Sequence, residues 1–184
     1  GIYSKTVNSV VYADLNLRSS TAAISSALTG GADSRPLYGA KVDATNFTNV
    51  ILLDNTNKGY TYSLTAQLQK NFSNGLSSMF AYTYSQAKSI NDGGSSTALS
   101  NWNGGFVPQV DGPNSQGLAT SLFQLRHRFI GSLSYKIEYG PGKLFGTGIS
   151  IFYSGNSGQP YSYVYNGDIN GDGGRTNDLI YVPR

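Results

Sequence analysis

Apolar and polar side chains alternate along much of this chain. In GYTYSLTAQLQKNF (59–72), apolar residues occupy the even positions and hydroxyl or amide residues the odd positions from Thr61 to Gln69. Successive side chains of a β-strand point to opposite faces, so this stretch predicts a strand with one apolar and one polar face. What covers the apolar face, a protein core or lipid, decides the class of protein.

The same alternation recurs along the chain and predicts a series of strands. They are expected near 2–12, 48–53, 60–70, 76–88, 122–139 and 144–154. The connections are of two kinds. Asn-Gly and Gly-Pro-Gly sequences predict tight turns near 71–75 and 140–143. Long loops rich in Gly, Ser and Asn are expected near 13–47, 89–121 and 155–184.

The order of turns and loops becomes regular if residues 48–69 form one long strand, bent or bulged around 55–59. Five strands then carry short turns at one end and long loops at the other, as in outer-membrane β-barrels, where the short turns are periplasmic and the long loops extracellular. Five strands cannot close a barrel, because single-chain barrels begin at eight. We therefore expect residues 1–184 to be an internal part of one larger barrel domain. The first residues also lack the basic start and apolar centre of a signal peptide, so we expect the true beginning to be missing.

Composition favours the same all-β class. The chain has 14 Tyr, 8 Phe and 23 Gly, and only 12% of its residues are charged, against roughly 25% in soluble domains. No apolar run approaches the roughly 18–20 residues of a membrane helix. A barrel wall in lipid around an uncharged polar lumen explains this sparse charge. A soluble β-sandwich produces identical alternation and stays open as the alternative.

Charged residues follow the alternation in LFQLRHRFIGSLSYKIEY (122–139). The odd positions are mostly apolar, whereas the even positions include the charged residues Arg126, Arg128, Lys136 and Glu138. These four are expected to face the lumen, because Arg or Lys on the lipid face near mid-membrane costs about 2–4 kcal/mol. His127 is the exception, and we expect it on the outer face near one interface.

Aromatic residues ten positions apart support the membrane interpretation. Tyr62 and Phe72 lie on one predicted strand, and Phe129 and Tyr139 on another. On a strand tilted by about 45° this spacing spans about 23 Å, which is close to the height of a barrel's apolar band. These residues are expected to form the two aromatic girdles.

Catalytic chemistry is poorly represented. The chain has one His, no Cys and ten carboxylates, most of which lie in predicted loops, so we expect no enzyme. Alternation points His127 away from Arg126 and Arg128, so these residues cannot converge on one substrate; the two arginines would instead hold an anion or pair with lumen carboxylates. The net charge of +3 is spread without a basic run, which argues against nucleic acid as a partner.

One segment predicts a cation site. In NGDINGDGGRTNDLIY (166–181), Asp168, Asn170 and Asp172 hold positions 1, 3 and 5 of a calcium loop, and Gly173 holds position 6. The acid expected at position 12 is absent, and Asp178 stands one position earlier. Asp168, Asn170, Asp172 and Asp178 are therefore the candidate ligands of calcium, the one cofactor predicted; an ordinary Asn/Asp/Gly-rich turn explains the same residues.

Four blocks, taken in order, resemble one family. They are NTNKGYTYSLTAQLQKNFSNGL, AYTYSQAKSINDGGSSTALSNW, LRHRFIGSLSYKIEY and ISIFYSGNSGQPYSYVYNGDINGDGGRTNDLIYVP. They resemble the late barrel strands and loops of TonB-dependent outer-membrane transporters, with closest likeness to the SusC-like or Oar-like group of Bacteroidetes, whose chains begin with a carboxypeptidase-regulatory-like domain. The resemblance covers nearly all of residues 45–183, while residues 1–44 match loosely.

The resemblance implies about five transmembrane strands of a 22-stranded, plugged barrel in the outer membrane. Such transporters take up large nutrients (glycans, peptides or chelated metals). The implied partners are outer-membrane lipid, the rest of the barrel and its plug, a SusD-like surface lipoprotein, and the TonB energy-coupling protein, reached through a missing N-terminal region. Substrate contacts are expected from Trp102, Tyr161, Tyr163 and Tyr165 in the long loops, although each could equally serve loop packing. A passive porin, a surface adhesion barrel and a soluble secreted module that binds calcium and carbohydrate are the alternatives.

Overall fold

The computed structural model describes residues 1–18, 24, 33–104 and 109–182. These residues form antiparallel β-sheets with one short α-helix, which confirms the all-β prediction. Within them, no helix has the length and apolar character needed to cross a membrane. The chain divides into two compact units, which we name the strand unit (1–4, 61–86 and 124–159) and the loop unit (5–60, 87–123 and 160–184).

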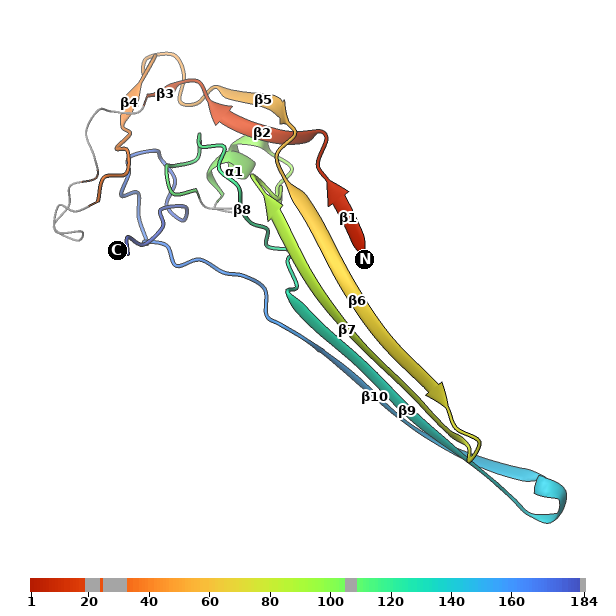
Figure 1. The fold of residues 1–184 in the computed structure, drawn as a ribbon. Helices are drawn as coiled ribbons and strands as arrows, with labels where there is room; N and C mark the ends of the chain where they lie inside the picture. Colours follow the sequence, from red (N-terminus) through yellow and green to blue (C-terminus); the bar gives the residue numbers. More distant parts are fainter. Residues whose placement is uncertain (19–23, 25–32, 105–108, 183–184) are drawn as a thin grey trace. The chain divides into compact units, whose positions relative to one another are not determined.

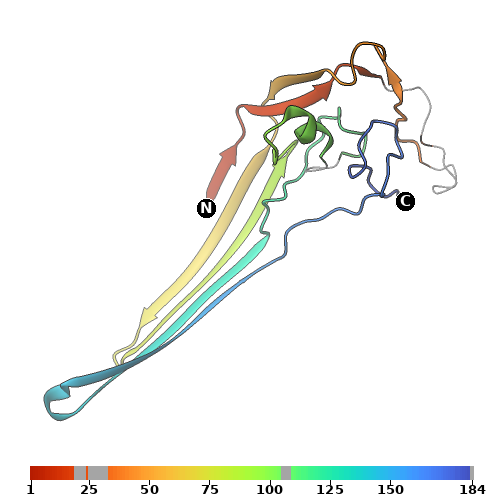
Figure 2. The same cartoon turned by 180° about the vertical axis from the view of Figure 1, so that it is seen from behind.

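Long strands lying side by side make up the strand unit (Figure 1). Its sheet has the order β1 (Ile2–Lys5), β6 (Tyr60–Asn71), β7 (Leu76–Ser89), β9 (His127–Tyr139) and β10 (Phe145–Asn156). The short strand β8 (Ala119–Thr120) pairs with the end of β7. The reverse view shows the same order from behind (Figure 2).

Register determines which side chains share a face. Leu133 of β9 lies opposite Ser78 of β7 and Ile151 of β10, whereas its neighbour Ser134 lies opposite Ser77 and Ser150. Directly opposed residues of antiparallel strands project to the same face. Most apolar and hydroxyl positions are therefore sorted between the two faces of the sheet, with Ser78 and Thr147 as hydroxyl residues on the side of Leu133.

Two tight connections join neighbouring strands. Between β6 and β7, the Phe72 N–H donates to the Leu76 carbonyl (2.7 Å), and Gly75 has a φ of +84°. A side chain at position 75 would collide with the Lys136 backbone, so glycine is required there. Between β9 and β10, the 3₁₀ turn η1 (Pro141–Lys143) closes when the Lys143 N–H donates to the Gly140 carbonyl (3.0 Å).

Short elements build the loop unit. Strand β2 (Ser9–Asp14) pairs with β5 (Ile51–Thr56), and β3 (Leu17–Arg18) pairs with β4 (Ala40–Lys41). Helix α1 (Ala98–Asn103) contacts β2 and β5. The core is small, with Leu17, Tyr38 and Trp102 at its centre and Tyr12 and Ile51 packed against them.

The predicted strands 2–12 and 48–69 are each divided in two. A bend or bulge around residues 55–59 was expected within one strand, but the strand is interrupted at 57–59, and β5 and β6 belong to different sheets, as do β1 and β2. The Thr6 N–H donates to the Gly59 carbonyl (3.1 Å), and the φ of +123° at Gly59 turns the chain out of the extended conformation. Residues 54–59 (DNTNKG) carry no apolar side chain, so the alternation stops there and could not reveal the change of sheet.

The predicted strand 122–139 begins five residues later than expected, at His127. Residues 121–126 lie outside any strand, with a turn at 122–123, and the Ser121 hydroxyl accepts a hydrogen bond from the Phe123 N–H (3.1 Å). The Leu125 carbonyl accepts from the hydroxyl of Ser85. Arg126 therefore lies just before β9. It was predicted to face the lumen because of its position in a strand, and the structure has no strand at that position.

Candidate functional site

One face of the strand unit is almost wholly apolar, and we call it the apolar face. Its apolar and aromatic members on the four long strands are Tyr62, Leu64, Ala66, Leu68, Leu76, Phe80, Tyr82, Tyr84, Phe129, Leu133, Tyr135, Ile137, Tyr139, Phe145, Ile149, Ile151 and Tyr153. The same face also carries Ser78, His127, Gly131, Thr147 and Gly155. Leu68 is 78% exposed and Ile151 is 64% exposed. A soluble protein rarely exposes so large a continuous hydrocarbon surface, so this face needs an apolar environment.

Aromatic rings gather at both ends of the apolar face. Near the tight turns, the Tyr139 and Phe145 rings stack with centroids 6.0 Å apart. Toward the other end, Tyr82 lies 4.8 Å from Phe129, and Tyr62 lies 6.1 Å from Tyr84, both between ring centroids. Two aromatic belts separated by aliphatic residues are typical of a surface that crosses the two interfaces of a membrane.

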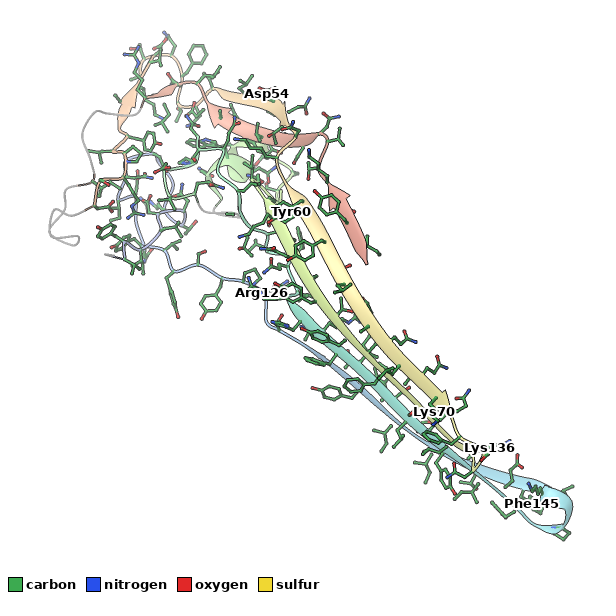
Figure 3. The ribbon with its side chains drawn as sticks, in the orientation of Figure 1. Asp54, Tyr60, Lys70, Arg126, Lys136 and Phe145 are labelled. Atoms are coloured by element: carbon green, nitrogen blue, oxygen red, sulfur yellow. The ribbon has the colours of Figure 1, made fainter. Side chains whose placement is uncertain are left out.

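The imidazole and the ammonium group on the apolar face lie near its ends, whereas the small hydroxyl of Ser78 lies opposite Leu133. His127 stands beside the aromatic group formed by Tyr82 and Tyr84, and its Nδ1 lies 2.8 Å from the Tyr82 hydroxyl. Lys70 precedes the first tight turn, and its Nζ lies 4.9 Å from the centre of the Phe72 ring. Figure 3 places Lys70 and Lys136 near the end of the sheet that carries the turns. Charge is thus kept from the middle of the apolar face.

The opposite, polar face carries paired hydroxyls and charges. Ser134 and Ser150 are joined by their hydroxyls (2.9 Å), as are Thr65 and Thr83 (2.9 Å). The Lys136 ammonium lies 2.7 Å from a Glu138 carboxylate oxygen, and Lys143 lies 4.0 Å from the other. Within the described residues, Arg126 and Arg128 form no ion pair, so the carboxylate pairing expected for them is not seen there. Phe152 and Met79 also occupy this face and interrupt its polarity.

A buried carboxylate organises the loop unit. Asp14 is 1% exposed and accepts hydrogen bonds from the backbone N–H groups of Asn16 and Val50 (both 2.9 Å) and from the Asn49 amide (2.7 Å). Burial opposes ionisation of Asp14, but these hydrogen bonds and the Lys41 ammonium at 3.5 Å together lower its pKa. The carboxylate is therefore held ionised inside the loops.

Asn114 ties the second long loop to the same network. Its side-chain oxygen accepts from the Asp14 N–H and from the Trp102 indole N–H (both 2.8 Å), and its amide donates to the Asp14 carbonyl (3.0 Å). Trp102 is only 5% exposed and packs in the core with Leu17 and Tyr38. The structure thus places Trp102 in loop packing, the other role considered for it, because its ring is buried and its one donor is already used; substrate contact by Trp102 stays a prediction.

Tyr38 is the point at which the three long loops meet. Its N–H donates to the Asn170 carbonyl and its hydroxyl to the Asp111 carbonyl, both at 2.6 Å. Arg35 reinforces this junction, since one terminal nitrogen (Nη1) donates to the Leu179 carbonyl (2.7 Å) while its remaining donors hold Asp33. The Arg35 guanidinium is the main cause of the lowered pKa of Asp33.

The other predicted aromatic contacts lie on the third long loop. Tyr161 and Tyr163 are 76% and 69% exposed, and their rings meet edge to face with centroids 5.4 Å apart. Tyr165 is partly buried, and its N–H donates to the Asp178 carbonyl (2.8 Å). Tyr161 and Tyr163 are thus placed to meet a partner from solution, whereas the backbone of Tyr165 belongs to a hairpin.

The predicted cation ligands come together at the tip of that hairpin. Asn170, Asp172 and Asp178 are buried, and Asp168 is exposed. In the described part of the chain, no three Asp, Glu, His or Cys side chains form a metal-binding group by themselves. Any ion held here would therefore need amide or carbonyl oxygens as further ligands.

A cavity of about 500 Å³ opens beside Arg35 in the loop unit. Its walls combine the Asp33–Arg35 ion pair with the apolar residues Val110 and Leu179 and with Tyr181. The Arg35 guanidinium lies 5.9 Å from the centre of the Tyr181 ring. Such a mixture suits a ligand that offers both hydrogen-bonding groups and apolar surface.

Sequence reasoning did not find Asp14, Arg35, Tyr38 or Asn114. Their partners lie up to 144 residues away in the chain, and no local spacing signals such contacts. The sequence offered only a weak signal for these residues, namely single Asp, Arg and Asn residues in loops that otherwise carry little charge.

Comparison with known proteins supplies the family. No curated protein and no solved structure matched the chain. A family model described as an outer membrane beta barrel domain matches residues 3–183. This match and the apolar face agree on the environment of the strands, so the chain belongs to the outer membrane beta barrel domain family and resides in the bacterial outer membrane.

Proposed function

We propose that this chain is the wall and outer-loop portion of a TonB-dependent, SusC-like transporter that actively imports a large nutrient, such as a glycan, a peptide or a chelated metal. The single observation that supports this proposal best is the construction of the loop unit. Its three long loops are fastened to one another through Tyr38, Asp14 and Asn114. A passive pore has no need for such a body, whereas a receptor needs a surface that keeps its shape.

Substrate recognition is assigned to two features of the loop unit. The cavity beside Arg35 offers an ion pair and apolar walls, and the exposed Tyr161–Tyr163 pair offers ring faces that stack on sugars or apolar side chains. Both features are compatible with a glycan or a peptide. The same loops would provide the landing surface for a SusD-like lipoprotein.

Energy coupling requires parts beyond the strands and loops described here. In this proposal, the polar face, with Arg128, Lys136 and Glu138, lines the lumen and faces a plug, and TonB acts on the plug from the periplasm. The proposed role is transport without catalysis. The soluble secreted module considered in the sequence analysis is set aside, because the chain belongs to an outer-membrane family.

Uptake in paired strains tests the proposal. The full-length protein is expressed in a TonB-positive strain and in its TonB-deficient sibling, and both receive labelled oligosaccharide, peptide and ferric-chelate pools. The proposal predicts that at least one pool accumulates in the first strain only. Equal accumulation in both strains would indicate a passive porin.

Conductance in planar bilayers separates the alternatives without knowledge of the substrate. A plugged transporter shows little steady ion current, whereas a porin shows stable open-channel steps. An adhesion barrel would show neither TonB-dependent accumulation nor open-channel steps. The Arg35→Ala variant, matched with Lys5→Ala outside the cavity, then tests whether the cavity recognises the accumulated pool.

A further inference from the structure

A hairpin in the third long loop carries the three carboxylates of the predicted cation motif. Val164 pairs with Leu179, the Ile180 N–H donates to the Tyr163 carbonyl (3.0 Å), and the Gly167 N–H donates to the Arg175 carbonyl (3.2 Å). The tip between these arms turns through Gly171 and Gly173, whose φ angles are +77° and +92°.

Backbone N–H groups donate hydrogen bonds to the carboxylates of Asp168 and Asp178 at the hairpin tip. Asp168 accepts from Gly171 (2.7 Å) and Gly173 (2.9 Å), and Asp178 accepts from Ile169 (2.7 Å). Turns of this kind form without any ion. These hydrogen bonds therefore explain how the tip turns, but they do not explain why polar and acidic side chains are buried inside it.

The interior contains an amide that is not satisfied. Asn177 is 7% exposed, and its Oδ1 is the one buried side-chain polar atom in the described residues that has no hydrogen-bond partner. Its Nδ2 points at Asp172 Oδ2 (3.0 Å), and the Asn170 Nδ2 points at the same oxygen (2.9 Å). A buried acceptor without a donor costs about 1–3 kcal/mol, which an oxygen-seeking cation would remove.

Negative charge in the interior is also uncompensated. Asp172 is 1% exposed, and among the described residues neither Asp168, Asp172 nor Asp178 forms an ion pair. A bound cation would supply the missing positive charge.

We propose that the hairpin tip binds one calcium ion, with Asp172 as the central ligand and the amide of Asn177 turned to present its oxygen to the ion. The side-chain oxygen and nitrogen of Asn exchange places by rotation about one bond, so the Asn177 amide can change from a donor to Asp172 into a ligand beside it. Asn170 keeps its orientation, because its Oδ1 already accepts a hydrogen bond from the Asp172 N–H (2.9 Å). Asp168 and Asp178 flank the ion. Calcium fits better than magnesium, because calcium accepts irregular sets of six to eight oxygens whereas magnesium demands near-ideal octahedra.

This ligand set differs from the one predicted from sequence. Asn177 joins it, and the motif's missing twelfth ligand is not needed. The site lies next to the junction of the long loops. The Asn170 carbonyl accepts a hydrogen bond from the Tyr38 N–H, and the Leu179 carbonyl accepts one from Arg35. An ion that stiffens this tip stiffens the junction of the long loops.

Calorimetric titration of the full-length protein in detergent with CaCl₂, over a constant background of MgCl₂, tests the proposal. We expect a Kd of about 10⁻⁴–10⁻³ M, the range of extracellular calcium modules. Asp172→Asn should weaken binding at least about tenfold, whereas Asn177→Asp adds a charged ligand and should strengthen it about threefold or more. Asp43→Asn is the matched control, because Asp43 accepts the Thr45 N–H and lies beside Asn46 in an exposed turn without an orphan amide.

Trypsin cleavage at the exposed Arg175 gives a second readout that does not depend on affinity alone. Calcium should slow cleavage there in the natural protein and in Asn177→Asp, and it should do so at lower concentration in the variant. No calcium heat up to about ten times the expected Kd would overturn the proposal. Unchanged affinity in both Asp172→Asn and Asn177→Asp would overturn it equally, since the ion would then sit elsewhere.

Discussion

Leu133 and Ser134 are adjacent on β9 but belong to opposite faces, and this makes them a sharp test of the membrane assignment. Leu133 lies on the apolar face, four residues after Phe129 and six before Tyr139, and therefore near the middle of the aliphatic band. Ser134 lies on the polar face between Ser77 and Ser150. We consider Leu133→Arg and Ser134→Arg as a matched pair.

The expected cost differs strongly between the two substitutions. An Arg that faces lipid near the bilayer midplane costs about 2–4 kcal/mol, which changes the folded-to-unfolded ratio about 30- to 900-fold. Arg at position 134 faces the polar side and loses the hydroxyl contact to Ser150, a cost of about 1 kcal/mol or less at an exposed site. Leu133→Arg should therefore be the less stable variant by at least about 1 kcal/mol.

Urea titration of the full-length barrel in lipid vesicles measures this difference, with the folded fraction read from its shifted mobility on unheated gels. Equal destabilisation by the two variants, or a larger effect at position 134, would refute the assignment of faces. Both substitutions introduce the same side chain in the same strand. Differences in charge or strand propensity therefore cannot produce the predicted order.

Two further predictions concern the loop unit. Trp102→Ala should destabilise the loops by about 3–5 kcal/mol, because it empties the core and removes the donor to Asn114; hydrogen exchange should then quicken throughout β2, while Tyr163→Ala should leave it unchanged. Asp14 has a lowered pKa in the folded loops, so its carboxylate stabilises them above its ordinary pKa near 3.8, and this contribution is lost as the pH falls through the lowered value. The urea midpoint of the unsubstituted protein should exceed that of Asp14→Asn by its largest amount at pH 6, and this difference should shrink below about pH 4. A difference that does not change with pH would contradict the stabilising role given to the ionised Asp14 carboxylate.

Alternation in the sequence predicted the long strands well. The bounds of β6, β7 and β10 fall within two residues of the expected ones, because a strand with two different environments must keep a period of two. The same signal failed at residues 122–126, which form no strand, although the Ser85 N–H donates to the Arg126 carbonyl (3.0 Å) and the Ser85 hydroxyl to the Leu125 carbonyl. Periodicity shows where a strand is possible, but it does not show which competing contacts end it.

The loop unit was much less predictable. The hairpin motif around Asp168 was visible because its residues are close in sequence. The sequence could not decide between exposure and packing for Trp102, because an aromatic residue in a Gly-rich loop looks the same in both cases; the structure packs it on Leu17 and Tyr38. The orphan oxygen of Asn177 arises only when the hairpin folds back, and therefore no spacing rule could find it.

The central claim is that acyl chains cover the apolar face. The chain has no cysteine, so Ile151→Cys and Ser150→Cys each place one fluorescent thiol label at neighbouring positions of β10 on opposite faces. In vesicles of brominated lipid, we predict strong quenching of the label at position 151 and weak quenching at position 150. Equal quenching at the two positions, or stronger quenching at position 150, would contradict the account.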